Sequence, residues 1–159
     1  MFFLRRFVSE IYEVLDCIKY DTGITGTATN IYTDTTYLDR KTEYTDITDN
    51  GSSTTFIYVE ISGNICIEFD ANVNVGDSNP FIAITNSGTV VGQKNQTNLG
   101  TVDDIWIHYK IEIKNNVATY TSDYNTSSTT SNLTEYNRFR LRKAVGETFK
   151  FKNVMVYPV

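Results

Sequence analysis

The side chains best suited to chemistry in this chain lie in two strand-like segments. In the first, Glu68 and Asp70 stand two residues apart and therefore share one face of an extended strand. Paired carboxylates can act as general acid and nucleophile on a glycosidic bond when the pKa of one of them is raised. This face is therefore the first candidate for a functional site.

The second segment holds the only tryptophan and the only histidine of the chain. Trp106, His108 and Lys110 share one side of this strand, opposite an isoleucine-rich side. A lone histidine supports neither a metal cluster of the usual kind nor an obvious serine triad. Cys17 and Cys66 lack the spacing of metal ligands, and two free thiols are a simpler interpretation than one disulfide. These residue types favour binding over metal-dependent catalysis.

Exposed aromatic rings beside polar groups suit a sugar ligand. The C–H faces of a sugar stack on aromatic rings, and charged or amide groups hydrogen-bond to its hydroxyls. Six side chains offer that chemistry if their strands are neighbours: Trp106, His108, Tyr58, Arg140, Glu68 and Asp70. The alternative is that the N-terminal segment or a neighbouring subunit covers Trp106.

Size and composition indicate one folded, strand-rich domain. The chain has 159 residues, of which 40% are hydrophobic and 13% aromatic, and threonine, isoleucine and tyrosine are plentiful. The net charge of −5 argues against a nucleic-acid partner and against anionic membranes. No apolar run is long enough to span a bilayer. The first arginines follow the apolar residues, so the start does not resemble a signal peptide.

Alternating apolar residues separated by polar turns predict an all-β protein, an antiparallel β-sandwich. Asn115-Asn116 suits a two-residue hairpin, which would place Ala118 and Tyr120 opposite Ile113 and Ile111. The alternation of apolar residues shifts by one position at Asn153, which predicts a β-bulge in the last strand. We expect strands near 31–38, 55–61, 65–75, 80–85, 88–93, 104–114, 117–122, 136–143 and 148–157.

The N-terminus has the periodicity of an amphipathic helix. The apolar residues are three or four positions apart: Leu4, Phe7, Ile11, Val14 and Ile18. We therefore expect a helical segment at 1–22 and a sandwich domain at 23–159. The apolar stripe could lie on the sandwich of its own chain or pair with copies of itself, and its regular spacing slightly favours a homo-oligomer.

Three segments resemble concanavalin A-like and laminin-G-like jelly rolls. These are Trp106–Ile113 with the turn after it, the closing run Phe149–Pro158, and Ile67-Glu68-Phe69-Asp70. The resemblance covers residues 55–158 and implies a jelly-roll fold. Members of this superfamily include lectins, glycosidases, adhesin modules and phage tail components, so the resemblance is specific for fold and weak for function.

The resemblance also bears on catalysis. Jelly-roll glucanases carry E-x-D-x-x-E on one strand, and this chain has Val73 where the second glutamate would stand. With that carboxylate missing, we predict that the chain is not an enzyme and has no catalytic residues. We expect no cofactor, although a structural calcium ion could bind to oxygen ligands in the loops: Asp77, Asn79, Asp103 and Asp104.

The sequence thus predicts a non-catalytic module that binds carbohydrate or a cell-surface receptor. The resemblance suggests a phage tail fibre or a surface adhesin, located on a virion or an extracellular surface. The first alternative is a purely structural assembly protein of the same fold. The second, disfavoured by Val73, is a jelly-roll glycosidase.

Overall fold

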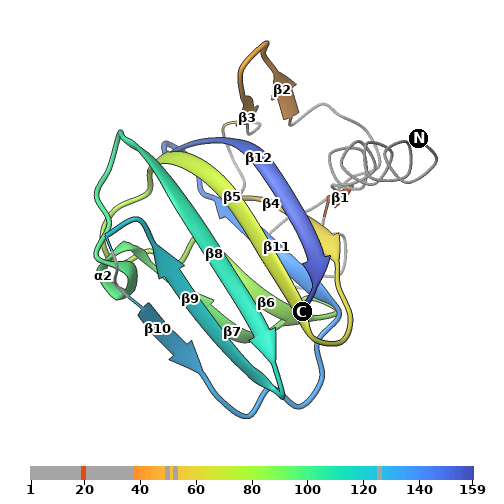
Figure 1. The fold of residues 1–159 in the computed structure, drawn as a ribbon. Coiled ribbons are helices and arrows are strands. Elements are labelled where there is room, and N and C mark those ends of the chain that lie inside the picture. Colours follow the sequence, from red (N-terminus) through yellow and green to blue (C-terminus); the bar gives the residue numbers. More distant parts are fainter. Residues whose placement is uncertain (1–18, 21–37, 49–50, 52–53, 125–126) are drawn as a thin grey trace, which may run out of the picture.

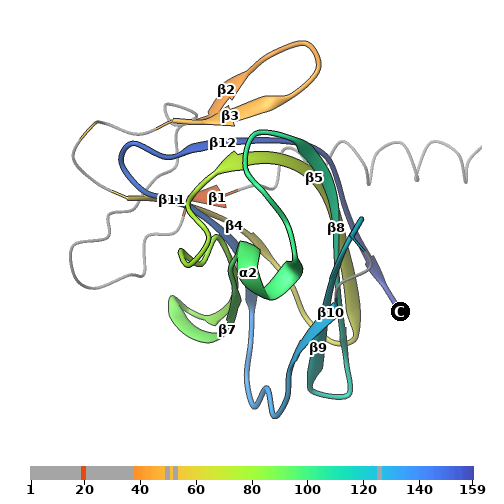
Figure 2. The same cartoon turned by 90° about the vertical axis from the view of Figure 1, so that its left-hand side faces the viewer.

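The computed structural model describes residues 19–20, 38–48, 51, 54–124 and 127–159, which form two antiparallel sheets packed face to face (Figures 1 and 2). The five-stranded sheet has the order β1 (Lys19–Tyr20), β4 (Thr55–Glu60), β11 (Arg138–Lys143), β6 (Ile82–Asn86) and β7 (Thr89–Lys94). The seven-stranded sheet has the order β10 (Ser127–Thr130), β9 (Val117–Ser122), β8 (Trp106–Lys114), β5 (Ile65–Asn74), β12 (Thr148–Pro158), β3 (Thr45–Ile47) and β2 (Leu38–Arg40). The predicted antiparallel β-sandwich is confirmed.

The β8–β9 hairpin forms as the sequence predicts. Asn115 and Asn116 have φ angles of 50° and 63°, in the left-handed region that asparagine tolerates. Ala118 pairs with Ile113 and Tyr120 with Ile111, and all four side chains are buried. Ile105, which continues the same alternation, is 41% exposed because the strand begins only at the next residue.

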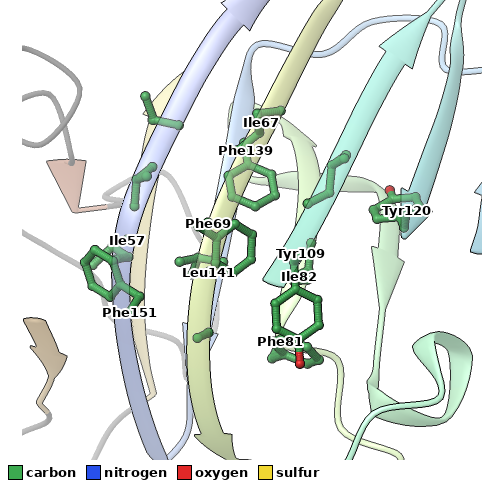
Figure 3. Packing of buried hydrophobic residues seen from close by; sticks show 14 of the residues in the cluster. Ile57, Ile67, Phe69, Phe81, Ile82, Tyr109, Tyr120, Phe139, Leu141 and Phe151 are labelled. Carbon is green, nitrogen blue, oxygen red and sulfur yellow. The ribbon is translucent and has the colours of Figure 1, made fainter. Parts of the chain in front are cut away.

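The core lies between the sheets and is rich in aromatic rings (Figure 3). Phe69 of β5 stacks on Tyr109 of β8 with ring centroids 5.3 Å apart, and Phe81 meets the same tyrosine edge-on at 5.5 Å. Phe139 of β11 reaches Phe69 from the opposite sheet at 5.8 Å. Each such side chain contributes about 1.5–3 kcal/mol of burial energy, so this cluster holds the two sheets together.

The predicted β-bulge is confirmed in β12. Lys152 pairs with Asp70 and Met155 with Glu68, so two residues of β12 stand opposite one residue of β5. Asn153 has a φ angle of 54° at this point. The extra residue changes which side chains point inward, so that Val154 is buried and Met155 is exposed.

The N-terminal predictions need one correction, and most of them lie outside the described residues. The helical segment was predicted for 1–22, yet residues 19 and 20 form β1 and pair with Tyr58 and Ile57 of β4. An unpaired strand edge offers backbone hydrogen bonds that outweigh a local helical preference. The five residues of the apolar stripe, and all of 31–38 except Leu38, are outside the described part.

Besides β1, three short elements were not predicted. β3, β10 and the four-residue helix α2 (Gln96–Leu99) are too short or too polar to show an apolar period. Asn95 caps α2 by accepting a hydrogen bond from the Asn98 backbone. No helix in the described ranges is long and apolar enough to cross a membrane.

Candidate functional site

Four of the six predicted site residues lie together on the face of the seven-stranded sheet that points away from the core. We call this surface the outer face, and define it by the outward side chains of β5, β8 and β12 together with the adjoining turn before β3. Asp70 of β5 pairs directly with His108 of β8, and Glu68 is the next outward residue along β5. Trp106 pairs with Asn72, two residues further along the two strands. Their convergence follows from the pairing of β5 with β8.

Asp70 holds the imidazole of His108. The Nδ1 of His108 lies 2.7 Å from Oδ1 of Asp70, and its Nε2 lies 4.0 Å from Oε1 of Glu68. On the other side of Asp70, the Asn153 amide donates to Oδ2 at 2.6 Å. The side chains of Asp70 and Glu68 are only 23% and 17% exposed, whereas that of His108 is 40% exposed. The two carboxylates are thus fixed in the sheet and the imidazole reaches solvent.

Aromatic rings and lysines form one end of the outer face. Trp106 is 38% exposed, and its ring centroid lies 5.8 Å from that of Tyr44. The Lys152 ammonium lies 4.3 Å from the Trp106 centroid, and that of Lys150 lies 5.5 Å from the Tyr44 centroid. These distances are those of cation–π contacts. The end of the face therefore combines ring surfaces with long, adaptable cationic side chains.

The opposite end of the outer face holds Cys66 and Tyr157, which are cross-strand partners. Cys66 is fully buried, and burial raises the pKa of its thiol. The contact with this thiol is the main cause that raises the pKa of Tyr157. A thiol held protonated in this way is a poor nucleophile, so Cys66 contributes packing to this face rather than reactivity.

The other two predicted site residues, Tyr58 and Arg140, lie in the five-stranded sheet, and the prediction of one six-residue site is therefore wrong. Both are buried. The Arg138 guanidinium lies 4.2 Å from the Tyr58 ring centroid, and that of Arg140 lies 4.3 Å from the Phe56 ring. Alternation along a strand tells which side chains face away from the core but not which sheet the strand joins.

The outer face also contains residues that the sequence did not single out. Tyr44, Lys150, Lys152 and Asn153 come from β12 and the turn before β3, far in sequence from β5 and β8. Asp123 accepts a hydrogen bond from the His108 backbone at 2.8 Å. Only Asn153 carried a signal, the change of phase that marked the bulge.

The loop carboxylates proposed for calcium make hydrogen bonds to the protein. Asp103 accepts from the Val75 backbone at 3.2 Å, and Asp104 accepts from the Asn74 amide at 2.9 Å. Within the described ranges, no group of three histidine, cysteine or acidic residues is placed to hold a metal ion. The calcium site stays a prediction.

Comparison with known proteins finds likeness in structure alone. No protein-family model matches the chain, and no curated protein matches it in sequence. A "Putative glycosyl hydrolase" from Parabacteroides distasonis superposes with a TM-score of 0.63 at 9% identity, over 80% of this chain and 93% of that one.

Two further solved structures have the same fold. The family 7 polysaccharide lyase A1-II′, an alginate lyase, gives a TM-score of 0.50 at 11% identity, over 88% of this chain and 92% of that one. The carbohydrate recognition domain of Emp47p gives a TM-score of 0.50 at 9% identity, over 90% of this chain and 95% of that one.

These comparisons correct the prediction that the chain is not an enzyme. The fold that it shares carries an alginate lyase and the Parabacteroides protein as well as a carbohydrate recognition domain. Val73 argues against one catalytic arrangement only, the carboxylate pair on a single strand, and says nothing of a site assembled from several strands. The likeness establishes the architecture alone: a jelly-roll β-sandwich, a fold also adopted by the alginate lyase, the Parabacteroides protein and the carbohydrate recognition domain of Emp47p.

Proposed function

We propose that the chain binds carbohydrate through the outer face of the seven-stranded sheet. The observation that carries this proposal is the half-exposed Trp106 ring, with Tyr44 beside it and the carboxylates of Asp70 and Glu68 on the adjacent strand. A sugar ring would stack at the aromatic end, and its hydroxyls would meet the carboxylates and the imidazole of His108.

Lys152 is the adaptable part of such a site. Its ammonium lies over the Trp106 ring at 4.3 Å, where a ligand would compete with it. A lysine has a flexible stem and a strongly hydrated charge, so it can leave the ring and donate a hydrogen bond to the ligand instead. The carbohydrate recognition domain of Emp47p has the same fold, and this supports a sugar ligand by analogy alone.

A glycan array on the full chain, followed by calorimetric titration of the natural chain and of each variant with every hit, tests the proposal. We expect Trp106→Ala to weaken binding at least roughly tenfold, the loss that removal of an aromatic anchor causes at other interfaces. Val90→Ala is the matched control, because Val90 is 39% exposed, much like Trp106, but lies on β7 of the other sheet. The proposal fails if no glycan binds, or if both variants bind as well as the natural chain.

A second candidate function is acid–base catalysis on the bound glycan. The observation that favours it is the pair formed by His108 and Asp70 at 2.7 Å, with Glu68 near the other imidazole nitrogen. A histidine oriented by a carboxylate can accept or donate a proton in cleavage. Glycans that bind should then lose polymer length, measured as new reducing ends, with the natural chain and not with His108→Ala. Intact glycans after long incubation with the natural chain would exclude this candidate.

The proposed biological setting is a receptor-binding module of a phage tail fibre or a surface adhesin, displayed on a virion or an extracellular surface. We further propose that the chain forms a homo-oligomer through Leu4, Phe7, Ile11, Val14 and Ile18, whose spacing is that of a helical seam. Light scattering on the full chain and on residues 19–159, which keep β1, tests this part. If the full chain has the mass of a monomer, as the truncated chain does, the oligomer is contradicted. The alternative function, a purely structural assembly protein, predicts an oligomer that binds no glycan.

A further inference from the structure

We propose that Asn153, the residue at the β-bulge of β12, positions His108 through Asp70, so that His108 offers an unprotonated Nε2 to ligands on the outer face. The role assigned to Nε2 rests on the proposed function, whereas the positioning itself does not. Three strands contribute to the arrangement: β12, β5 and β8. Each step follows from a short contact.

The bulge places an amide beside Asp70. Asn153 has a φ angle of 54°, a conformation that asparagine and glycine adopt more readily than other residues. Its Nδ2 donates a hydrogen bond to Oδ2 of Asp70 at 2.6 Å. Bulges redirect side chains beside functional sites in other sheets, and this bulge turns the Asn153 side chain towards Asp70. It fixes the orientation of the Asp70 carboxylate.

Asp70 in turn determines which nitrogen of His108 carries the proton. An ionised carboxylate can only accept hydrogen bonds, so the contact of 2.7 Å requires that Nδ1 of His108 donates to Oδ1 of Asp70. In a neutral imidazole with its proton on Nδ1, the other nitrogen, Nε2, has a free lone pair. The carboxylate therefore selects the tautomer in which Nε2 is an acceptor.

The backbone of His108 is also held in place. Its N–H donates to Oδ2 of Asp123 at 2.8 Å, and the Asp123 N–H donates to the His108 carbonyl at 3.1 Å. With the backbone bound on one side and Nδ1 on the other, the ring has little freedom to turn. Because the ring is restrained, Asn153 can affect the imidazole indirectly: it binds Asp70, and Asp70 binds His108.

Nε2 has room for a ligand donor. Oε1 of Glu68 lies 4.0 Å from Nε2, which is too long for a hydrogen bond, and the His108 side chain is 40% exposed. Glu68 pairs across the strands with Lys110, and Lys110 also lies 3.6 Å from Glu112. A sugar hydroxyl placed between Glu68 and His108 could donate to Nε2.

The chain has one histidine, so its imidazole can be observed without ambiguity. Nitrogen NMR spectra of histidine-labelled full-length protein, recorded at a pH where the ring is neutral, test the assignment of the tautomer. The two ring nitrogens have different shifts in the two tautomers. In the natural chain we expect the form protonated at Nδ1 to dominate.

Asn153→Gly is the informative variant, because glycine accepts the positive φ angle and removes only the amide. We expect it to shift the equilibrium towards the form protonated at Nε2, and Asp70→Asn to shift it further. Asn132→Gly is the matched control, because Asn132 has a φ angle of 60° in a loop before β11 and its substitution should leave the spectrum unchanged. An unchanged spectrum for Asn153→Gly, or a natural chain protonated at Nε2, would overturn the positioning role.

Glycan affinity is a separate measurement. For a glycan that binds the natural chain, the shift in tautomer should weaken binding about three- to tenfold, the value of one hydrogen bond. A tautomer shift with unchanged affinity would refute the role of Nε2 in binding. If no glycan binds at all, the proposed function fails, while the spectra still decide whether Asn153 positions His108.

Discussion

Two buried tyrosines should make the protein sensitive to alkali. Tyr109 and Tyr120 are fully buried, and burial raises the pKa of each to about 12, with a small opposing effect from a nearby threonine hydroxyl. In the unfolded chain both phenols would ionise near their ordinary pKa of about 10. The stabilisation from keeping them protonated is therefore complete below about pH 10 and is lost as the pH rises towards about 12.

The size of this effect follows from the difference between the two pKa values. At about pH 11 the unfolded chain has released most of one proton from each phenol and the folded chain has released almost none, which costs about 1.4 kcal/mol for each tyrosine. Together they cost about 3 kcal/mol. A domain of this size is stable by only about 5–15 kcal/mol, so the loss should be easy to measure.

Urea unfolding followed by circular dichroism, from about pH 8 to about pH 11, measures the loss. The reference is the double variant Tyr109→Phe, Tyr120→Phe, which keeps both rings in the core. At neutral pH each substitution should cost less than about 1 kcal/mol. Other groups that titrate in this range affect both proteins alike, so the comparison isolates the two phenols. The reasoning is refuted if the double variant loses as much stability between these pH values as the natural chain does.

Two substitutions and one labelling experiment test the packing and the turns. Gly92→Ala should lower the free energy of unfolding by about 1–3 kcal/mol, because the added Cβ would lie 2.9 Å from the Tyr120 hydroxyl; thermal unfolding measures it. Asn116→Gly should leave stability unchanged or raise it by less than about 1 kcal/mol, because the φ angle of 63° suits glycine; a lower midpoint in urea would contradict this. In a Cys17→Ser background, Cys66 should react with a thiol reagent only after unfolding, because burial raises its pKa and shields the sulfur; rapid labelling of the folded protein would contradict the buried position.

The hairpin and the long strands show how far the sequence can predict this fold. The period of two in β5 and β8 is a local property, since neighbouring side chains of a strand point to opposite faces whatever strand lies beside it. The turn at Asn115-Asn116 is local as well, because asparagine tolerates positive φ. β10 could not be found in this way, since its four residues are serine and threonine and its pairing depends on the exposed edge of β9.

The candidate site was predicted only in part for a related reason. The pairing of β5 with β8 brings together four of the predicted residues: Glu68, Asp70, Trp106 and His108. The sequence could predict this grouping only on the assumption that the two strands are neighbours. Tyr58 satisfied the same outward pattern and lies in the other sheet, where Arg138 covers its ring. Inward and outward positions are local properties, and sheet membership is not.

The amino-acid sequence by itself determined the class of fold, the face of each long strand that enters the core, the hairpin and the bulge, because each depends on side-chain period or on backbone preferences at one or two residues. Only the tertiary structure decided which strands are neighbours, and therefore that Lys152 lies on Trp106 and that Asn153 reaches Asp70 across the sheet. Strand order results from the packing of the whole core, in which Phe69 and Phe139 join the sheets. No short stretch of sequence contains that information.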